Sequence, residues 1–187
     1  MAITPTTPIP LGFTAPVFAL PDAMSGDVLR SYDLFKDGPT VVVFMCNHCP
    51  FVIHLLEGLV KFAREYQEKG VNFVAISSNN VETHPQDGFP QMKDLAEKYS
   101  IPFPYLYDES QQVAKAYDAA CTPDFSAFDT GKKCVYRGQF DNSRPGNDTP
   151  VTGSDMRKVL DILLSGDRVP AAGQIPSIGC NVKWKAT

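Results

Sequence analysis

The chain has 187 residues, of which 43% are hydrophobic and 20% are charged, as expected for one globular domain with a full core. The formal net charge is -4 and no run of lysine or arginine occurs, so nucleic acid and anionic membranes are not expected partners. No apolar run approaches the roughly 20 residues of a membrane span. The first 16 residues lack the basic start and apolar core of an export signal. We therefore expect a single domain over residues 1–187, located in the cytoplasm.

The N-terminal third predicts an extended arm, a hairpin and a buried strand. Four prolines in residues 1–16 indicate an extended arm with little regular structure. Residues 17–20 and 28–35 flank a turn-rich segment and predict a β-hairpin. Residues 39–45, PTVVVFM, form a continuous apolar run, which is typical of a strand covered on both faces.

The rest of the chain alternates between helix and strand patterns. Apolar residues recur every three or four positions from Pro50 to Lys69, and Gly70 ends this helix. Further helices are predicted over residues 91–100, 109–119 and 154–166, the last with Ser154 as its N-cap and Gly166 as its stop. Strands are predicted over residues 71–77, 124–129 and 134–140, with a short segment at 104–108 and a turn at Gly131. Residues 167–187 are expected to be an irregular tail, and the whole order indicates an α/β sheet with helices on both faces.

Two cysteines mark the junction between the buried strand and the first long helix. Cys46 is expected where the strand ends and the helix begins, and a helix N-terminus stabilises a thiolate, the reactive form. Pro50 suits the first helical turn, where its missing N–H costs nothing. The spacing allows Cys49 to form a disulfide with Cys46. Structural disulfides are rare in the cytoplasm, so a close pair of cysteines is expected to be catalytic or metal-binding. We expect Cys46, at the exposed lip, to attack and Cys49, further into the helix, to resolve.

Three stretches resemble the thioredoxin superfamily, and in particular its alkyl hydroperoxide reductase/thiol-specific antioxidant branch. They are VVVFMCNHCPF, CTPDFSAFDTGKKCVYRGQFD and PSIGCNVKWK. The resemblance implies a thioredoxin fold, with a central mixed sheet, helices on both faces, an N-terminal β-hairpin extension and an irregular C-terminal tail. It also implies that Pro123 is the cis-proline packed against the dithiol and that Thr122 lines the site.

The residues between the two cysteines depart from the thioredoxin pattern. Asn47 and His48 stand where thioredoxins have Gly-Pro. A histidine before the second cysteine is similar to that of oxidising disulfide exchangers, so we expect His48 to stabilise the Cys46 thiolate and raise the reduction potential. The preceding strand contains no acid, so the sequence identifies no proton acceptor for the resolving step. Peroxiredoxins carry threonine in place of Cys46 and their peroxidatic cysteine in place of Cys49. No proline and threonine stand at that spacing before either cysteine here, so dithiol-disulfide exchange is the simpler prediction and peroxidase activity is its rival.

Cys121, Cys180 and Arg144 have two interpretations each. Cys121 precedes Thr122 and is either a third redox sulfur or a small buried residue. Cys180 lies in the glycine-containing tail and is either a resolving partner that swings in or a structural tether. Cys134 is expected to pack within a strand. Arg144 resembles the arginine that supports a peroxidatic thiolate, but we expect instead a loop ion pair with Asp141 or with another acid.

A metal site is a second alternative. Cys46, Cys49, Cys121 and His48 are ligands of the type that zinc or copper accepts. No second CxxC and no histidine pair at metal-ligand spacing occur, and His84 is a distant loop residue, so we expect no metal. His54, on the helix after Cys49, is expected to be a surface or packing residue.

The sequence therefore predicts a thiol-disulfide oxidoreductase that uses a redox-active disulfide. We expect its substrate to be a disulfide in a protein or small molecule and its reductant to be an external dithiol. No organic cofactor is expected, because neither a Gly-rich phosphate loop nor a dinucleotide motif occurs. The alternatives are a thiol peroxidase acting on hydroperoxides and a carrier or sensor of copper or zinc.

Overall fold

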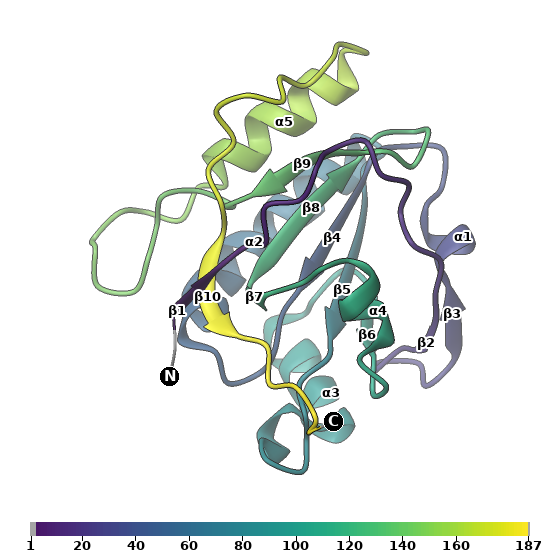
Figure 1. The fold of residues 1–187 in the computed structure, drawn as a ribbon, viewed down its shortest axis with the longest axis vertical. Coiled ribbons are helices and arrows are strands. Elements are labelled where there is room, and N and C mark those ends of the chain that lie inside the picture. Colours follow the sequence, from purple (N-terminus) through teal and green to yellow (C-terminus); the bar gives the residue numbers. More distant parts are fainter. Residues whose placement is uncertain (1–2, 187) are drawn as a thin grey trace.

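A five-stranded mixed sheet forms the centre of the protein in a computed structural model that describes residues 3–186 (Figure 1). Its strands, in spatial order, are β6 (Tyr105–Tyr107), β5 (Asn72–Ser77), β4 (Thr40–Phe44), β8 (Asp124–Phe128) and β9 (Cys134–Gly138). β4, β5 and β6 run parallel, while β8 and β9 are antiparallel to their neighbours.

Both faces of this sheet are buried, because alternate side chains of β4 enter different cores. Val41 and Val43 join one cluster, and Val42 and Phe44 join the other. The first cluster is covered by α2 (Pro50–Glu68), α3 (Phe89–Tyr99) and α5 (Ser154–Leu164). The second is covered by α4 (Gln112–Ala116) and by the N-terminal hairpin region. Because both faces of β4 are buried, its sequence is an unbroken run of mostly apolar residues.

The N-terminal hairpin is confirmed, with β2 (Ala19–Pro21) antiparallel to β3 (Val28–Arg30). The following α1 (Ser31–Leu34) is a helical turn within the range predicted as strand. The hairpin forms its own two-stranded sheet and is joined to β6 by a bridge between Asp22 and Leu106. It is therefore an extension beside the central sheet rather than part of it.

A second small sheet corrects the prediction of an irregular arm and an irregular tail. β1 (Ile3–Pro5) pairs with β10 (Ile178–Asn181), and β10 pairs with β7 (Cys121–Thr122). Figure 1 shows this yellow strand crossing in front of the molecule next to the N-terminal strand. The tail prediction is wrong for these four residues, because their regularity comes from pairing with segments far away in the chain. The prediction for residues 1, 2 and 187 lies outside the described residues.

The caps of two helices show how local chemistry sets their ends. Gly70 ends α2 with a φ of 89°, as predicted. The predicted N-cap Ser154 is wrong by one residue, because Gly153 holds the cap position with a φ of 66°. The carboxylate of Asp141 accepts hydrogen bonds from the backbone N–H groups of Thr152 and Gly153, at 2.7 and 2.6 Å. Asp141 therefore supplies the anion that the start of α5 favours.

The 3₁₀ turn η1 (Pro85–Asp87) lies between β5 and α3 and matters for the site described below. Within residues 3–186, no helix combines the length and apolar character needed to cross a membrane.

Candidate active site

The two cysteines lie in a short loop between β4 and α2. β4 ends at Phe44, and the loop carries Cys46, Asn47 and His48 before the helix begins at Pro50. α2 begins at Pro50 as predicted, with Cys49 as its N-cap residue, so Cys46 lies three residues before the cap and not at the helix start where it was expected. Pro50 at the first helical position is the reason, since its missing N–H and fixed φ favour that start.

Four contacts define the positions of the two buried sulfurs. The Cys46 Sγ lies 3.5 Å from the Thr122 Oγ1 and 3.8 Å from the His48 Nδ1. The Cys49 Sγ lies 3.0 Å from the Thr122 carbonyl oxygen and 3.0 Å from the Cys180 Sγ. Each of the two side chains is almost fully buried, with 1% of Cys46 and none of Cys49 exposed.

Thr122 and Pro123 meet the dithiol as the resemblance implied. Their peptide bond is cis, and both polar oxygens of Thr122 face the cysteine pair. Thr122 ends β7, and β8 begins after Pro123, so the central sheet and the small sheet both fix this segment. The sequence-predicted supporting residues are therefore brought together with the cysteines.

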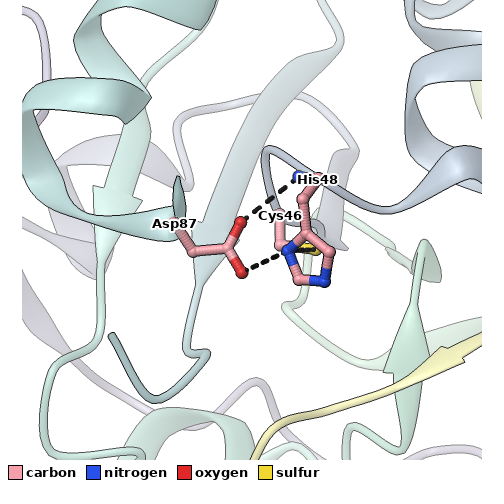
Figure 2. A group of neighbouring side chains, drawn as sticks. All are labelled: Cys46, His48 and Asp87. Carbon is pink, nitrogen blue, oxygen red and sulfur yellow. Dashed lines mark hydrogen bonds and ion pairs between the residues drawn. The ribbon is translucent and has the colours of Figure 1, made fainter. Parts of the chain in front are cut away.

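Asp87 is the residue that sequence analysis missed. It comes from η1, is fully buried, and lies against the loop of the two cysteines. Its Oδ1 accepts hydrogen bonds from the backbone N–H groups of Asn47 and His48, at 2.8 and 3.3 Å. Its Oδ2 lies 2.7 Å from the His48 Nδ1 and accepts a hydrogen bond of 2.8 Å from the Asn79 Nδ2. Figure 2 shows the carboxylate facing His48, with Cys46 next to the imidazole.

Further contacts fix Asn47 and His48. The Asn47 Nδ2 donates to the Gln86 carbonyl at 3.0 Å, and its Oδ1 accepts from the Tyr105 hydroxyl at 3.0 Å. The His48 ring stacks on the ring of His84, with the centroids 5.1 Å apart. His48 remains part-exposed. The two residues between the cysteines are thus held in one arrangement.

The electrostatics favour the thiolate on Cys49. Its pKa is lowered by the Cys46 thiol, which donates to it, and by donors from Cys180, Thr122 and the Val52 backbone N–H. The Thr122 carbonyl opposes this effect, because a carbonyl accepts only and so favours the Cys49 thiol. Several donors outweigh one acceptor, and the helix N-terminus acts in the same direction.

Cys46 has the opposite tendency. Its pKa is raised first by the hydrogen bond that it gives to Cys49, then by burial, and then by the negative charge of Asp87. The opposite pKa shifts favour the thiol form of Cys46 and the thiolate form of Cys49, with the Cys46 thiol donating to Cys49. The sequence predicted the thiolate on Cys46, whereas the structure favours it on Cys49, the N-cap residue of α2.

The other predicted candidates are placed differently. Cys121 is buried, and its thiol donates to the Pro123 carbonyl at 3.6 Å, while burial raises its pKa. Cys134 packs in the second core cluster, on the other side of the sheet from the pair, and burial raises its pKa to about 12. Arg144 donates to the Asp141 and Ser143 carbonyls, both at 2.7 Å, and to the Gln139 side chain. Its donors thus serve its own loop. His54 is a packing residue whose Nε2 lies 2.7 Å from the Ser143 Oγ.

One group of side chains has the composition of a metal site. The ligand atoms of Cys46, His48 and Asp87 all lie within 4.8 Å of one another. Both oxygens of Asp87 already accept two hydrogen bonds each, so an ion here would have to displace donors that now hold the loop. The group can hold a metal only by giving up this arrangement.

Comparison with known proteins adds a family and a fold. The sequence model of the AhpC/TSA family matches residues 11–140. An uncharacterized conserved protein from Geobacillus kaustophilus is 55% identical, with a TM-score of 0.97 over 100% of this chain and 98% of that chain. A hypothetical protein from Sinorhizobium meliloti 1021 is 44% identical, with a TM-score of 0.95 over 98% and 100%. The search of curated proteins finds no match.

A more distant structure identifies the fold. The thioredoxin domain of a thiol-disulfide oxidoreductase from Bacteroides vulgatus is 18% identical, with a TM-score of 0.62 over 82% of this chain and 99% of that chain. Likeness at this identity shows the fold alone. It confirms the predicted thioredoxin fold, with its mixed sheet and helices on both faces.

Proposed function

The chain belongs to the AhpC/TSA family, and from this premise we propose that it is a thiol-disulfide oxidoreductase whose working dithiol is Cys46 and Cys49. Family membership supports a thioredoxin-like redox role in general. The observation that carries the specific proposal is the buried pair of sulfurs, with Cys46 against the Thr122 hydroxyl and Cys49 against the Thr122 carbonyl, beside cis-Pro123.

Cys46 is the proposed attacking sulfur because of its surroundings. It borders on His48, which is part-exposed, whereas Cys49 is enclosed by Thr122 and Cys180. A small hollow next to Pro123 is lined by Phe51 and Ile178, among others, so the surface beside the cis-proline is partly apolar.

The reaction can be written with the residues in place. When a substrate disulfide meets Cys46, the proton of the Cys46 thiol moves to Cys49, and the Cys46 thiolate attacks one substrate sulfur. The substrate S–S bond breaks, a mixed disulfide forms on Cys46, and the first substrate sulfur leaves as a thiolate that takes a proton from solvent. Cys49 then attacks the Cys46 sulfur, and its proton goes to the second departing sulfur. Two electrons have passed to the substrate, and an external dithiol restores the pair.

Asp87 anchors the loop between the two cysteines, a role that the sequence analysis did not identify. It fixes the backbone at Asn47 and His48, so the two sulfurs keep their relative position as the proton moves. We propose no organic cofactor, since the disulfide itself carries the electrons. The proposed location is the cytoplasm, where thiol reductants keep such a pair reduced.

The proposal is tested by disulfide exchange with trapping of the intermediate. Wild-type protein should reduce insulin disulfides, and both Cys46→Ser and Cys49→Ser should abolish this activity. Cys49→Ser should accumulate a mixed disulfide on Cys46, which mass spectrometry of acid-quenched samples detects. Cys134→Ser is the matched control, since this thiol is equally buried but lies in the other core cluster. An inactive wild-type protein, or trapping on Cys49 in Cys46→Ser instead, would remove the proposed roles.

A thiol peroxidase is the second candidate, and the thiolate at Cys49 favours it. A sulfur at a helix N-cap with a lowered pKa is suited to attack a peroxide. Against this, Cys49 is fully buried and the donors of Arg144 serve its own loop. Stopped-flow mixing of reduced protein with hydrogen peroxide decides between the two. Rapid and saturable loss of thiol at Cys49 supports the peroxidase, and rates of ordinary thiols exclude it.

A metal carrier or sensor is the third candidate, based on the group Cys46, His48 and Asp87. Titration of the reduced protein with zinc or Cu(I), followed by mass spectrometry under native conditions, tests it. Tight one-to-one binding that Cys46→Ser abolishes supports this function.

A further inference from the structure

Cys49 contacts the sulfurs of two other cysteines, and only one of them belongs to the CxxC pair. Its first sulfur neighbour is Cys46, which donates a hydrogen bond to it. Its second is Cys180, whose Sγ lies 3.0 Å from the Cys49 Sγ. We propose that Cys180 is a third redox sulfur, which takes over the disulfide from the Cys46–Cys49 pair and stores it as a buried Cys49–Cys180 bridge. This inference rests on the proposed function, which supplies the Cys46–Cys49 disulfide.

The strand that carries Cys180 is fixed on both edges. In β10, Cys180 is the register partner of Ile3 in β1 and of Thr122 in β7. Figure 1 shows β10 lying against β1, and the pairing with β7 places Cys180 next to the segment that also touches Cys49. Cys180 therefore reaches Cys49 without any swing of the tail. The expectation of a mobile resolving partner is replaced by a preformed contact.

Gly179 makes this close approach feasible. A Cβ at this position would lie 1.9 Å from the Thr122 carbonyl oxygen and 2.6 Å from its carbon. Any other residue would push β10 away from β7 and would carry Cys180 away from Cys49. The requirement for glycine next to Cys180 is a direct consequence of bringing this sulfur to the site.

The chain after Cys180 is tied to the loop of the dithiol as well. The Lys183 backbone N–H donates to the Asn79 Oδ1 at 2.8 Å, and the Asn79 Nδ2 donates to the Asp87 Oδ2 at 2.8 Å. Asp87 in turn holds the backbone at His48. One continuous set of hydrogen bonds thus holds the tail and the cysteine loop in register, which keeps the Cys49–Cys180 contact in place.

The proposed step is an internal thiol-disulfide exchange and needs no outside reagent. The Cys180 sulfur attacks the Cys49 sulfur of the Cys46–Cys49 disulfide, a Cys49–Cys180 bond forms, and the Cys46–Cys49 bond breaks. Cys46 leaves as a thiolate and takes the proton that Cys180 gives up. The number of disulfides and thiols is unchanged, so electrons and protons balance. Cys49 is the sulfur in contact with both others, which is the position that such an exchange requires.

The charge on Cys49 regulates when Cys180 can react. Burial and then the hydrogen bond and charge of Cys49 raise the pKa of the Cys180 thiol to about 12. In the reduced protein Cys180 therefore stays protonated beside the Cys49 thiolate. Once Cys49 is in a disulfide, it carries no charge, and one cause of the raised pKa is gone. Oxidation of the pair thus makes Cys180 a better nucleophile.

The consequence for function is that the oxidised protein presents a thiol again. With the disulfide stored between Cys49 and Cys180, Cys46 returns to the thiol form beside His48. A second substrate disulfide that it attacks then stays attached as a mixed disulfide, because its resolving partner is occupied. The third sulfur thereby turns a dithiol into a site that can hold a substrate until the reductant arrives.

Peptide mapping of the oxidised full-length protein tests the proposal. Cys46→Ser is treated with diamide, quenched with acid, alkylated and digested with trypsin. The Cys49–Cys180 bridge links two separate tryptic peptides, residues 37–61 and 169–183, whereas a Cys46–Cys49 bridge stays within one. We expect the linked peptides to be the main oxidised product of Cys46→Ser, to be a fraction of oxidised wild type, and to be unchanged in Cys134→Ser.

A second measurement follows the thiol of Cys46. Oxidised wild type should contain a fraction that is alkylated at Cys46, and Cys180→Ser should lose this fraction. If folded Cys46→Ser forms only intermolecular dimers or no linked peptides, the third-sulfur proposal is wrong, and this result does not depend on whether Cys180→Ser folds. The insulin assay on wild-type protein separates the two ideas. Linked peptides without insulin reduction would overturn the proposed function alone, and activity without linked peptides would overturn the third sulfur alone.

Discussion

Replacement of Asp87 by asparagine is expected to activate Cys46 and to weaken the loop that carries it. Each carboxylate oxygen of Asp87 accepts two hydrogen bonds, Oδ1 from the backbone of Asn47 and His48, and Oδ2 from the side chains of His48 and Asn79. An asparagine has one oxygen, so one pair of donors would face an NH₂ group instead. The substitution also removes a negative charge beside the Cys46 sulfur.

The lost hydrogen bonds lower the stability, and the lost charge changes the Cys46 pKa, each by an amount that the structure sets. Each buried donor left without its acceptor costs about 1 to 3 kcal/mol, so the loss of one pair should lower the free energy of unfolding by about 2 to 6 kcal/mol. The charge effect is set by the separation of the Asp87 and Cys46 ligand atoms, which is within 4.8 Å. At an effective dielectric constant of about 20, two unit charges at that separation repel by about 3 kcal/mol. The Cys46 thiolate is favoured by that amount once the charge is removed, which is about a hundredfold in its population at fixed pH.

The assay is alkylation of the reduced protein by iodoacetamide, with Cys46 and Cys49 resolved by tandem mass spectrometry. A less basic thiolate is also a weaker nucleophile, which cancels about half of the gain on a logarithmic scale. We therefore expect the rate at Cys46 to rise about tenfold at neutral pH in Asp87→Asn. Asp94→Asn is the control, because Asp94 is an exposed carboxylate on the neighbouring helix α3.

Two comparisons of Asp87→Asn with wild type can contradict these expectations. If Asp87→Asn folds and its rate at Cys46 equals that of wild type or falls, then the charge of Asp87 does not hold the Cys46 pKa up. If its unfolding midpoint in urea also equals that of wild type, Asp87 does not anchor the loop either. Far-UV circular dichroism of both variants establishes that the fold is intact before the rates are compared.

Three further results are expected. Reduced wild type should absorb at 240 nm at neutral pH as a thiolate, because the pKa of Cys49 is lowered, and the band should vanish only in acid and be missing from Cys49→Ser. Gly179→Ala should lower the unfolding free energy by about 1 to 3 kcal/mol in urea, since its Cβ would lie 1.9 Å from the Thr122 oxygen, and an unchanged midpoint would contradict the tight contact. Glu65, hydrogen-bonded to Arg157 and Lys69, has its pKa lowered to about 2, so its stabilisation is present above about pH 4.5 and is lost as the pH falls towards 2. Because Glu65 is exposed, Glu65→Gln should cost less than about 1 kcal/mol at neutral pH and nothing at pH 2 in urea titrations.

The central sheet could be predicted because its strands carry their own pattern. Residues 39–45 and 71–77 are apolar on both faces, and this requires burial between two layers. β1 and β10 have no such pattern, since each is only three or four residues long and includes proline or glycine. Their regularity comes from pairing over almost the entire length of the chain, which no local window of sequence contains.

The candidate site also has one part that the sequence could reveal and one part that only the folded chain brings together. The pair of cysteines and the Thr122–Pro123 segment are short motifs, and the structure brings them together as the resemblance implied. Asp87 lies in a polar loop with no pattern around it, and only the folded chain brings it to His48. One local signal was available for the thiolate position. Pro50 at the first helical position marks Cys49 as the N-cap, and this signal would have placed the anion on Cys49 from the sequence alone.

The placement of the anion also connects the two proposals, because Cys46 and Cys180 compete for the same sulfur. In the internal exchange Cys46 is the leaving group, and a thiol of lower pKa leaves faster. Asp87 raises the pKa of Cys46 and so favours the Cys46–Cys49 disulfide over the buried bridge. Asp87→Asn should therefore increase the fraction of Cys49–Cys180 linked peptides in the oxidised protein relative to wild type and to Asp94→Asn. A fraction that stays the same while alkylation of Cys46 accelerates would mean that the exchange does not proceed through Cys46 as the leaving sulfur.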